Sequence, residues 1–147
     1  FENTSKMCFA ANLSGSAISI SKTTAPHAVS YPFTSLFGIS HGHAVSLTLE
    51  KFLAFNFVNI KFSKTSFDLK KRYEIIFKLT KTKNIFELSN YIKKIKNEAN
   101  LNDNFSDLGV NIKNNYSKII SGVNPSRLKN NPVLITPSDL KAVLMNN

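Results

Sequence analysis

The chain has 147 residues, 42% of them hydrophobic and 19% charged, a composition that fits one globular domain and excludes a disordered segment. No run of residues approaches the roughly 18 apolar positions that a membrane helix requires. Cys8 is the single cysteine, so an intrachain disulfide is excluded. With no signal peptide in the sequence, we expect a cytoplasmic protein.

The formal net charge is +10, and residues 61–147 carry sixteen of the nineteen lysines and arginines. Such a positive charge is compatible with binding to nucleic acid or to an anionic membrane. The lysines, however, fall at the solvent-facing positions of helical patterns, among many Asn and Ile residues. We interpret them as a solvated surface and keep a small basic nucleic-acid-binding protein as an alternative.

The N-terminal pattern predicts a helix from Ser5 to about Ser21, since apolar and small residues recur there at helical spacing. Gly15 inside a helix costs about 1 kcal/mol relative to alanine. We therefore expect another backbone to approach this helix at its small residues, which are Ala11, Ser14, Gly15 and Ala17. Pro26 is expected to end this helix or to begin the next one.

Residues 27–40 contain Pro32 and Gly38, and we interpret them as a short helical turn followed by a loop. From about His41 to Asn59 the sequence is strongly apolar and helical in pattern, which predicts the buried centre of the domain. An alternative remains for residues 52–62, where apolar residues nearly alternate and phenylalanines favour a strand.

Four further helices follow in the sequence. Ser66 is expected to cap a helix that buries Leu69, Tyr73, Ile76 and Phe77. Asn84 and Glu87 have the spacing of a capping box for the next helix. Residues 100–109 are predicted to be a loop and 111–120 a helix. Thr136 and Pro137 mark the start of the last helix, which buries Leu140, Val143 and Leu144. The prediction is an all-α, single bundle-like domain of six to eight helices.

All three histidines lie between residues 22 and 44. His27 and His41 are fourteen residues apart, and on one continuous helix they would be about 21 Å apart. The breaks at Pro32 and Gly38 allow them instead to point to one place from two helical segments. Neutral imidazoles are common metal ligands, but a catalytic site usually has three or four protein ligands. The others would have to come from outside this chain. His43 lies across the helix from His41 and is not expected to reach the same ion.

The stretch APHAVSYPFTSLFGISHGHAVSLTL, residues 25–49, resembles the signature of the iron-containing (group III) alcohol dehydrogenases. In that family two histidines fourteen residues apart bind a divalent metal, in a pattern close to H-(A/G)-x-(S/A)-H-P followed by P-H-G. The matching positions here are His27, Ala28, Ser30, Pro32, His41 and Gly42. Residues 12–17, 108–110, 131–132 and 136–140 are similar to outer parts of the family pattern, in order.

The resemblance also shows departures. Tyr31 stands where many relatives carry another histidine near the nicotinamide, Ser40 replaces the usual proline, and His43 is not general. Within the family, residues 22–32 and 41–45 are most similar to the branch of phosphonoacetaldehyde reductases, also called hydroxyethylphosphonate dehydrogenases. By this resemblance Thr23, Thr24 and Tyr31 are candidates to line the substrate pocket, and His43 is a candidate to meet an anionic substrate group. A solvated helix histidine is the other interpretation of His43.

The resemblance implies that residues 1–147 form the C-terminal helical domain of a two-domain dehydrogenase, without its N-terminal α/β nucleotide-binding domain. His27 and His41 would then ligate a divalent metal, Fe²⁺ or alternatively Zn²⁺. The full enzyme would use NAD or NADP on a small alcohol or aldehyde, and its oligomeric state is left open. The five glycines are scattered, so no dinucleotide-binding turn is expected in this chain. A truncated, inactive homologue is the other alternative.

Overall fold

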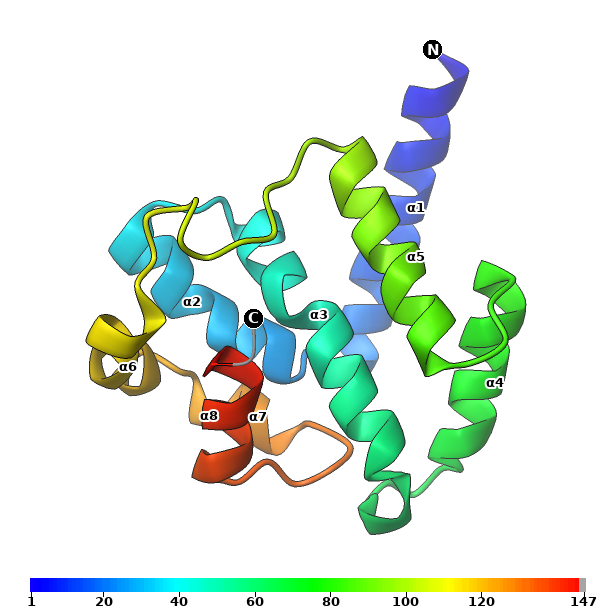
Figure 1. The fold of residues 1–147 in the computed structure, drawn as a ribbon. Helices are drawn as coiled ribbons and strands as arrows, with labels where there is room; N and C mark the ends of the chain where they lie inside the picture. Colours follow the sequence, from blue (N-terminus) through cyan, green and yellow to red (C-terminus); the bar gives the residue numbers. More distant parts are fainter. Residues whose placement is uncertain (146–147) are drawn as a thin grey trace.

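The computed structural model describes residues 1–145, and in this part regular secondary structure is helical (Figure 1). The α-helices are α1 (Glu2–Ser21), α2 (Ala25–Phe37), α3 (His41–Val58), α4 (Leu69–Thr80), α5 (Ile85–Glu98), α6 (Ile112–Ser121), α7 (Pro125–Lys129) and α8 (Pro137–Met145), with a 3₁₀ turn η1 (Ile60–Phe62). One isolated antiparallel bridge joins Ser63 to Val133. The all-α prediction is confirmed for these residues. The strand alternative for 52–62 is wrong, because α3 continues to Val58 and η1 follows it.

Helices α2 and α3 form the centre of the fold, with α5 on one side of α3 and α6, α7 and α8 packed around the other side (Figure 1). The main core gathers residues from these helices and from the loop before α6: Ala25, Val29, Phe33, Ile39, Ala44, Leu47, Phe52, Phe105, Val110, Ile112, Ile119, Ile135, Leu140 and Leu144. Burial of this apolar surface is the main force that holds the helices together. The prediction that α3 is central is therefore confirmed.

Helix α2 corrects the prediction of a loop in residues 27–40, because it continues unbroken through Pro32 to Phe37. A proline inside a helix leaves the carbonyl four residues earlier without its usual donor. Here that carbonyl belongs to Ala28, and it accepts a hydrogen bond of 3.3 Å from the backbone N–H of Asn124. A partner from the α6–α7 connection thus satisfies the group that Pro32 leaves open. Gly38, in the left-handed conformation with φ of 69°, ends the helix.

The helix starts agree with the sequence in most places. Asn84 caps α5 by accepting from the N–H of Glu87, and the Glu87 carboxylate accepts in turn from the N–H of Lys83. The predicted loop at 100–109 and the predicted starts of α6 and α8 are also confirmed. Ser66 was the wrong cap for α4, since Asp68 accepts from the N–H of Lys71. The short helix α7 was not predicted.

The capping box at α5 gives a modest stability test. Asn84→Ala is expected to lower the free energy of unfolding by about 1 kcal/mol, because it removes the acceptor for an N–H of the first helical turn. Urea denaturation followed by circular dichroism measures the change. Asn90→Ala, at an exposed position in the middle of the same helix, should have little effect or stabilise slightly. Equal losses from the two variants would contradict the capping role.

Helix α1 is 20 residues long, and none of its residues is buried. It leads away from the other helices, with the N-terminus at its far end (Figure 1). Its exposed large apolar residues are Met7, Phe9, Leu13, Ile18 and Ile20. A side chain placed at Gly15 would meet nothing within 4 Å. The close backbone approach predicted for this helix is therefore not made by the described part of the chain.

Candidate functional site

The two histidines singled out in the sequence lie together in the structure. His27 is the third residue of α2 and His41 is the first residue of α3. After the left-handed turn at Gly38, the start of α3 lies against α2, where His41 contacts Ser30 and Tyr31. Their ring centroids are 5.5 Å apart, with the planes inclined by 60°. Two imidazoles that are fourteen positions apart in sequence thus share one small region at the α2–α3 junction.

Ser30 connects the two histidines and was not among the candidate residues predicted from sequence. Its side chain is fully buried. The hydroxyl donates to the carbonyl oxygen of His27 at 2.9 Å and lies 3.4 Å from Nδ1 of His41. Because the hydroxyl hydrogen is already used, its lone pair can accept from Nδ1–H of His41. In that tautomer Nε2 of His41 keeps its lone pair, which is the form that binds a metal ion.

The surroundings of His27 favour its neutral form. Its pKa lies below the usual value because burial disfavours the charged ring and because His41 and Arg127 add unfavourable positive charge. Only the neutral imidazole offers a lone pair to a metal. His27 therefore remains in its ligating form to lower pH than an exposed histidine would.

Tyr31 lies one helical turn after His27 and brings a third ring to the same place. Its ring centroid is 5.6 Å from that of His41. Tyr31 also contacts Arg127, whose guanidinium carbon lies 4.7 Å from the centre of the Tyr31 ring. Tyr31 therefore lies next to the histidine pair, and its role in lining a substrate pocket stays a prediction.

Arg127 also lines a cavity of about 490 Å³ whose wall includes Lys22, Thr23, Asn124 and Asn130. Asn130 donates to the backbone carbonyl of Thr23 at 3.0 Å, so the segment before α2 is held against the end of α7. Of the two predicted pocket threonines, Thr23 lines this cavity. Thr24 is the half-buried N-cap residue of α2 and does not line it.

His43 lies apart from this group in its contacts. Its Nε2 is 2.6 Å from the backbone carbonyl oxygen of Asn102, in the loop that follows α5. Among the described residues it makes no ring contact with His27 or His41 like the one that those two share. The contact that the structure shows for His43 is therefore with the loop that follows α5, and its role toward an anionic group stays a prediction.

The donor set at the α2–α3 junction fits part of a metal site. Two neutral imidazoles suit Fe²⁺ and Zn²⁺. Within residues 1–145 there is no place where three His, Cys, Asp or Glu side chains gather closely enough to hold an ion. Cys8 is exposed on α1 and belongs to no such group. The pair can therefore supply two ligands, and a complete site needs others.

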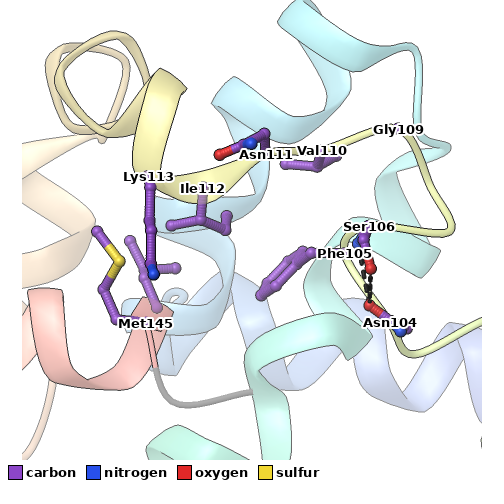
Figure 2. Close-up of a pocket in the computed structure, with 10 residues that line it drawn as sticks. Asn104, Phe105, Ser106, Gly109, Val110, Asn111, Ile112, Lys113 and Met145 are labelled. Atoms are coloured by element: carbon purple, nitrogen blue, oxygen red, sulfur yellow. Dashed lines mark hydrogen bonds between the residues drawn. The ribbon is translucent and has the colours of Figure 1, made fainter.

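A larger cavity, of about 630 Å³, lies elsewhere in the molecule (Figure 2). Its lining comes from the loop before α6, from the start of α6 and from the end of α8, and includes Phe105, Ile112, Lys113 and Met145. No histidine or carboxylate lines it. This cavity is larger than the one beside Arg127, but its lining offers no side chain suited to metal binding or acid–base chemistry.

Comparisons with known proteins agree with these observations. Residues 1–147 match the model of the Fe-containing alcohol dehydrogenase family, C-terminal. A segment of 47 residues is 47% identical to the phosphonoacetaldehyde reductase of Streptomyces viridochromogenes, and it covers 32% of this chain and 12% of that protein. The match thus spans a small part of the reductase's length. No solved structure matches the chain significantly. None of the helices among the described residues is long and apolar enough to cross a membrane.

Proposed function

The chain belongs to the C-terminal part of the Fe-containing alcohol dehydrogenase family, and on that premise we propose that it is the metal-binding helical domain of an NAD(P)-linked alcohol dehydrogenase or aldehyde reductase. The observation that carries the proposal is the pairing of His27 and His41 at 5.5 Å between ring centroids. Iron is the metal that the family's description names, and zinc is the alternative that two imidazoles also suit.

In this proposal His27 and His41 hold the divalent metal through their unprotonated ring nitrogens. When bound, the metal supplies a Lewis acid that polarises an aldehyde oxygen or lowers the pKa of an alcohol. A hydrogen bond from Nδ1–H of His41 to the Ser30 hydroxyl, 3.4 Å away, would leave Nε2 of His41 free for the metal. Burial and the nearby positive charge lower the pKa of His27 and so favour its neutral form. The Tyr31 ring covers the side of His41 and restricts the space in which a substrate can lie.

The substrate class is proposed from the relative that the chain is similar to. That protein is named a phosphonoacetaldehyde reductase, and the same reaction is the first candidate here. Reduction of a neutral aldehyde is the alternative within the same enzyme class.

The dinucleotide and the remaining metal ligands are proposed to come from protein outside residues 1–147. The chain contains no glycine-rich strand–turn–helix to seat a pyrophosphate. Helix α1 presents exposed apolar residues and a glycine with open space around it, which suits contact with another domain. We use the term complete enzyme for residues 1–147 joined to such a dinucleotide-binding domain.

A separation of the two parts tests this division of roles. Residues 1–147 alone are expected to bind divalent metal weakly, to bind neither NAD nor NADP, and to reduce no aldehyde. Two imidazoles lack the other ligands of a full site, and hydride donor and acceptor cannot be brought together without a dinucleotide seat. The complete enzyme should bind a dinucleotide and should reduce an aldehyde. Isothermal titration with each dinucleotide and an NAD(P)H absorbance assay measure these two functions, and substantial reductase activity from residues 1–147 alone would refute the proposal.

A further inference from the structure

Arg127 has a charge that no other described residue neutralises. It is half-buried, and the ion pairs found among residues 1–145 do not include it. Its backbone N–H is bonded to Asn124, but the guanidinium donates no hydrogen bond to a described side chain or carbonyl. A guanidinium carries five N–H donors, and a partly buried one normally gains an anionic or carbonyl partner. The guanidinium donors of Arg127 are therefore available to a ligand.

The position of Arg127 connects two features of the site. Its guanidinium lies 4.7 Å from the Tyr31 ring centre, and that ring lies 5.6 Å from His41. The same residue lines the 490 Å³ cavity, which also contains Lys22. Two cationic side chains therefore face one cavity, and no aspartate or glutamate lines it. The positive charges of Arg127 and Lys22 favour the binding of an anion in this cavity. Arg127 contacts the Tyr31 ring, which in turn contacts His41.

The other arginine of the chain shows that the aromatic contact alone does not explain this arrangement. Arg72 on α4 lies 5.4 Å from the centre of the Phe67 ring. Both Arg72 and Phe67 are exposed, and they are remote in sequence from the histidines. Arg72 has the same type of contact without a shared cationic cavity. It therefore provides a matched control for the loss of one positive charge and one ring contact.

We propose that Arg127, with Lys22 on the wall of the same cavity, binds the anionic group of a short aldehyde whose carbonyl oxygen lies at the His27–His41 pair. This inference rests on the proposed function and adds the residue that selects the substrate. The planar fork of a guanidinium matches two oxygens of a phosphonate or carboxylate in a bidentate contact. Arg127 is thus the specificity-determining residue of this proposal, and the contact that His43 makes through Nε2 is with the backbone carbonyl of Asn102.

Kinetics of the complete enzyme test the selection. Phosphonoacetaldehyde is the dianionic probe, malonic semialdehyde the carboxylate probe and propionaldehyde the neutral one. Arg127→Met should lower kcat/KM for phosphonoacetaldehyde by roughly 30-fold or more, because a charge-assisted bidentate contact is lost, and should change that for propionaldehyde by less than about 3-fold. Arg127→Lys, which keeps the charge without the fork, should give an intermediate loss. Arg72→Met should leave all three values unchanged.

The relative losses distinguish the anions. A fall for phosphonoacetaldehyde that exceeds the fall for malonic semialdehyde identifies a phosphonate site, and the reverse order identifies a carboxylate site; either order supports the inference. A uniform fall for all three aldehydes would overturn it, since Arg127 would then act only through the packing of Tyr31. The inference would also be overturned if Arg127→Met lost dinucleotide affinity while the ratio of kcat/KM for anionic and neutral aldehydes stayed unchanged. Arg127 would then bind the phosphates of the dinucleotide.

Direct binding separates this inference from the proposed function. Methylphosphonate is titrated into wild-type, Arg127→Met and Arg72→Met protein and followed by ³¹P NMR. If the complete enzyme reduces no aldehyde but methylphosphonate binds in an Arg127-dependent manner, the anion site stands and the proposed function fails. If the enzyme reduces propionaldehyde and phosphonoacetaldehyde equally well and methylphosphonate does not bind, the proposed function stands and the anion site fails.

Discussion

Replacing His41 with alanine in the complete enzyme is expected to lower turnover by roughly 10³-fold or more. The variant loses one of the two imidazoles that lie 5.5 Å apart at the α2–α3 junction, and with it a proposed metal ligand. Lewis-acid stabilisation is worth several kcal/mol of the barrier, and each 1.36 kcal/mol corresponds to a factor of ten in rate. Dinucleotide affinity should change little, because the dinucleotide is proposed to be held by the other domain. Metal content by mass spectrometry and steady-state kinetics measure the two effects.

His43→Ala is the matched control, since it removes another histidine two residues further along α3. Its ring bonds to the carbonyl of Asn102, so the variant should keep its metal and most of its turnover. The lost hydrogen bond should lower the free energy of unfolding by about 1 kcal/mol. If His43→Ala abolished turnover and His41→Ala did not, the assignment of the ligand pair would be wrong.

The histidine pair could be predicted because its determinants are local. Fourteen residues separate His27 and His41, and the Gly38 turn between them could be recognised in the sequence. The continuation of α2 through Pro32 could not be predicted, since the compensating donor comes from Asn124, far along the chain. Pro32 alone favours a break, and the packing of the α6–α7 connection overrides that preference.

The other residues of the site illustrate the same limit. Arg127 reaches Tyr31 across 96 positions of sequence, and no periodicity or motif near either residue indicates that contact. Ser30 lies within the recognised stretch, three residues after His27 on the same helix, and its spacing could have indicated a hydrogen bond to the His27 carbonyl. Its proximity to His41 follows only from the way α2 and α3 pack.

The small-residue pattern of α1 predicted a close packing partner that residues 1–145 do not supply. Its residues are exposed along the whole helix, and Asn130 contacts only its end, at the carbonyl of Ser21. A pattern of small residues predicts that another segment packs against the helix, but it does not predict where in the sequence that segment lies. In the complete enzyme the proposed partner is the dinucleotide-binding domain.

Lys96→Met is expected to lower the free energy of unfolding by about 3–5 kcal/mol. Lys96 lies on α5 with 4% of its side chain exposed, and its Nζ is 3.0 Å from Oε2 of Glu50 on α3. It also contacts Asp103 and the carbonyl of Ser46. The ammonium thus joins α3, α5 and the loop that follows α5. Removing it leaves the Glu50 carboxylate buried without its cationic partner, and an uncompensated buried charge is strongly destabilising.

The neighbouring ion pair on α5 separates the effect of burial from that of charge. Lys94 lies 3.7 Å from Glu98, but 73% and 65% of the two side chains are exposed, so Lys94→Met should cost less than about 0.5 kcal/mol. Adding Glu50→Gln to Lys96→Met should recover part of the loss, since a neutral amide is less costly to bury than an unpaired carboxylate. Urea denaturation of the three variants measures the differences. Equal losses from Lys94→Met and Lys96→Met would show that the cluster contributes only surface charge. A double variant less stable than Lys96→Met would show that the Glu50 carboxylate has another partner. The expected order therefore depends on one property of the cluster, which is that α3 and α5 enclose both charges of the Glu50–Lys96 pair.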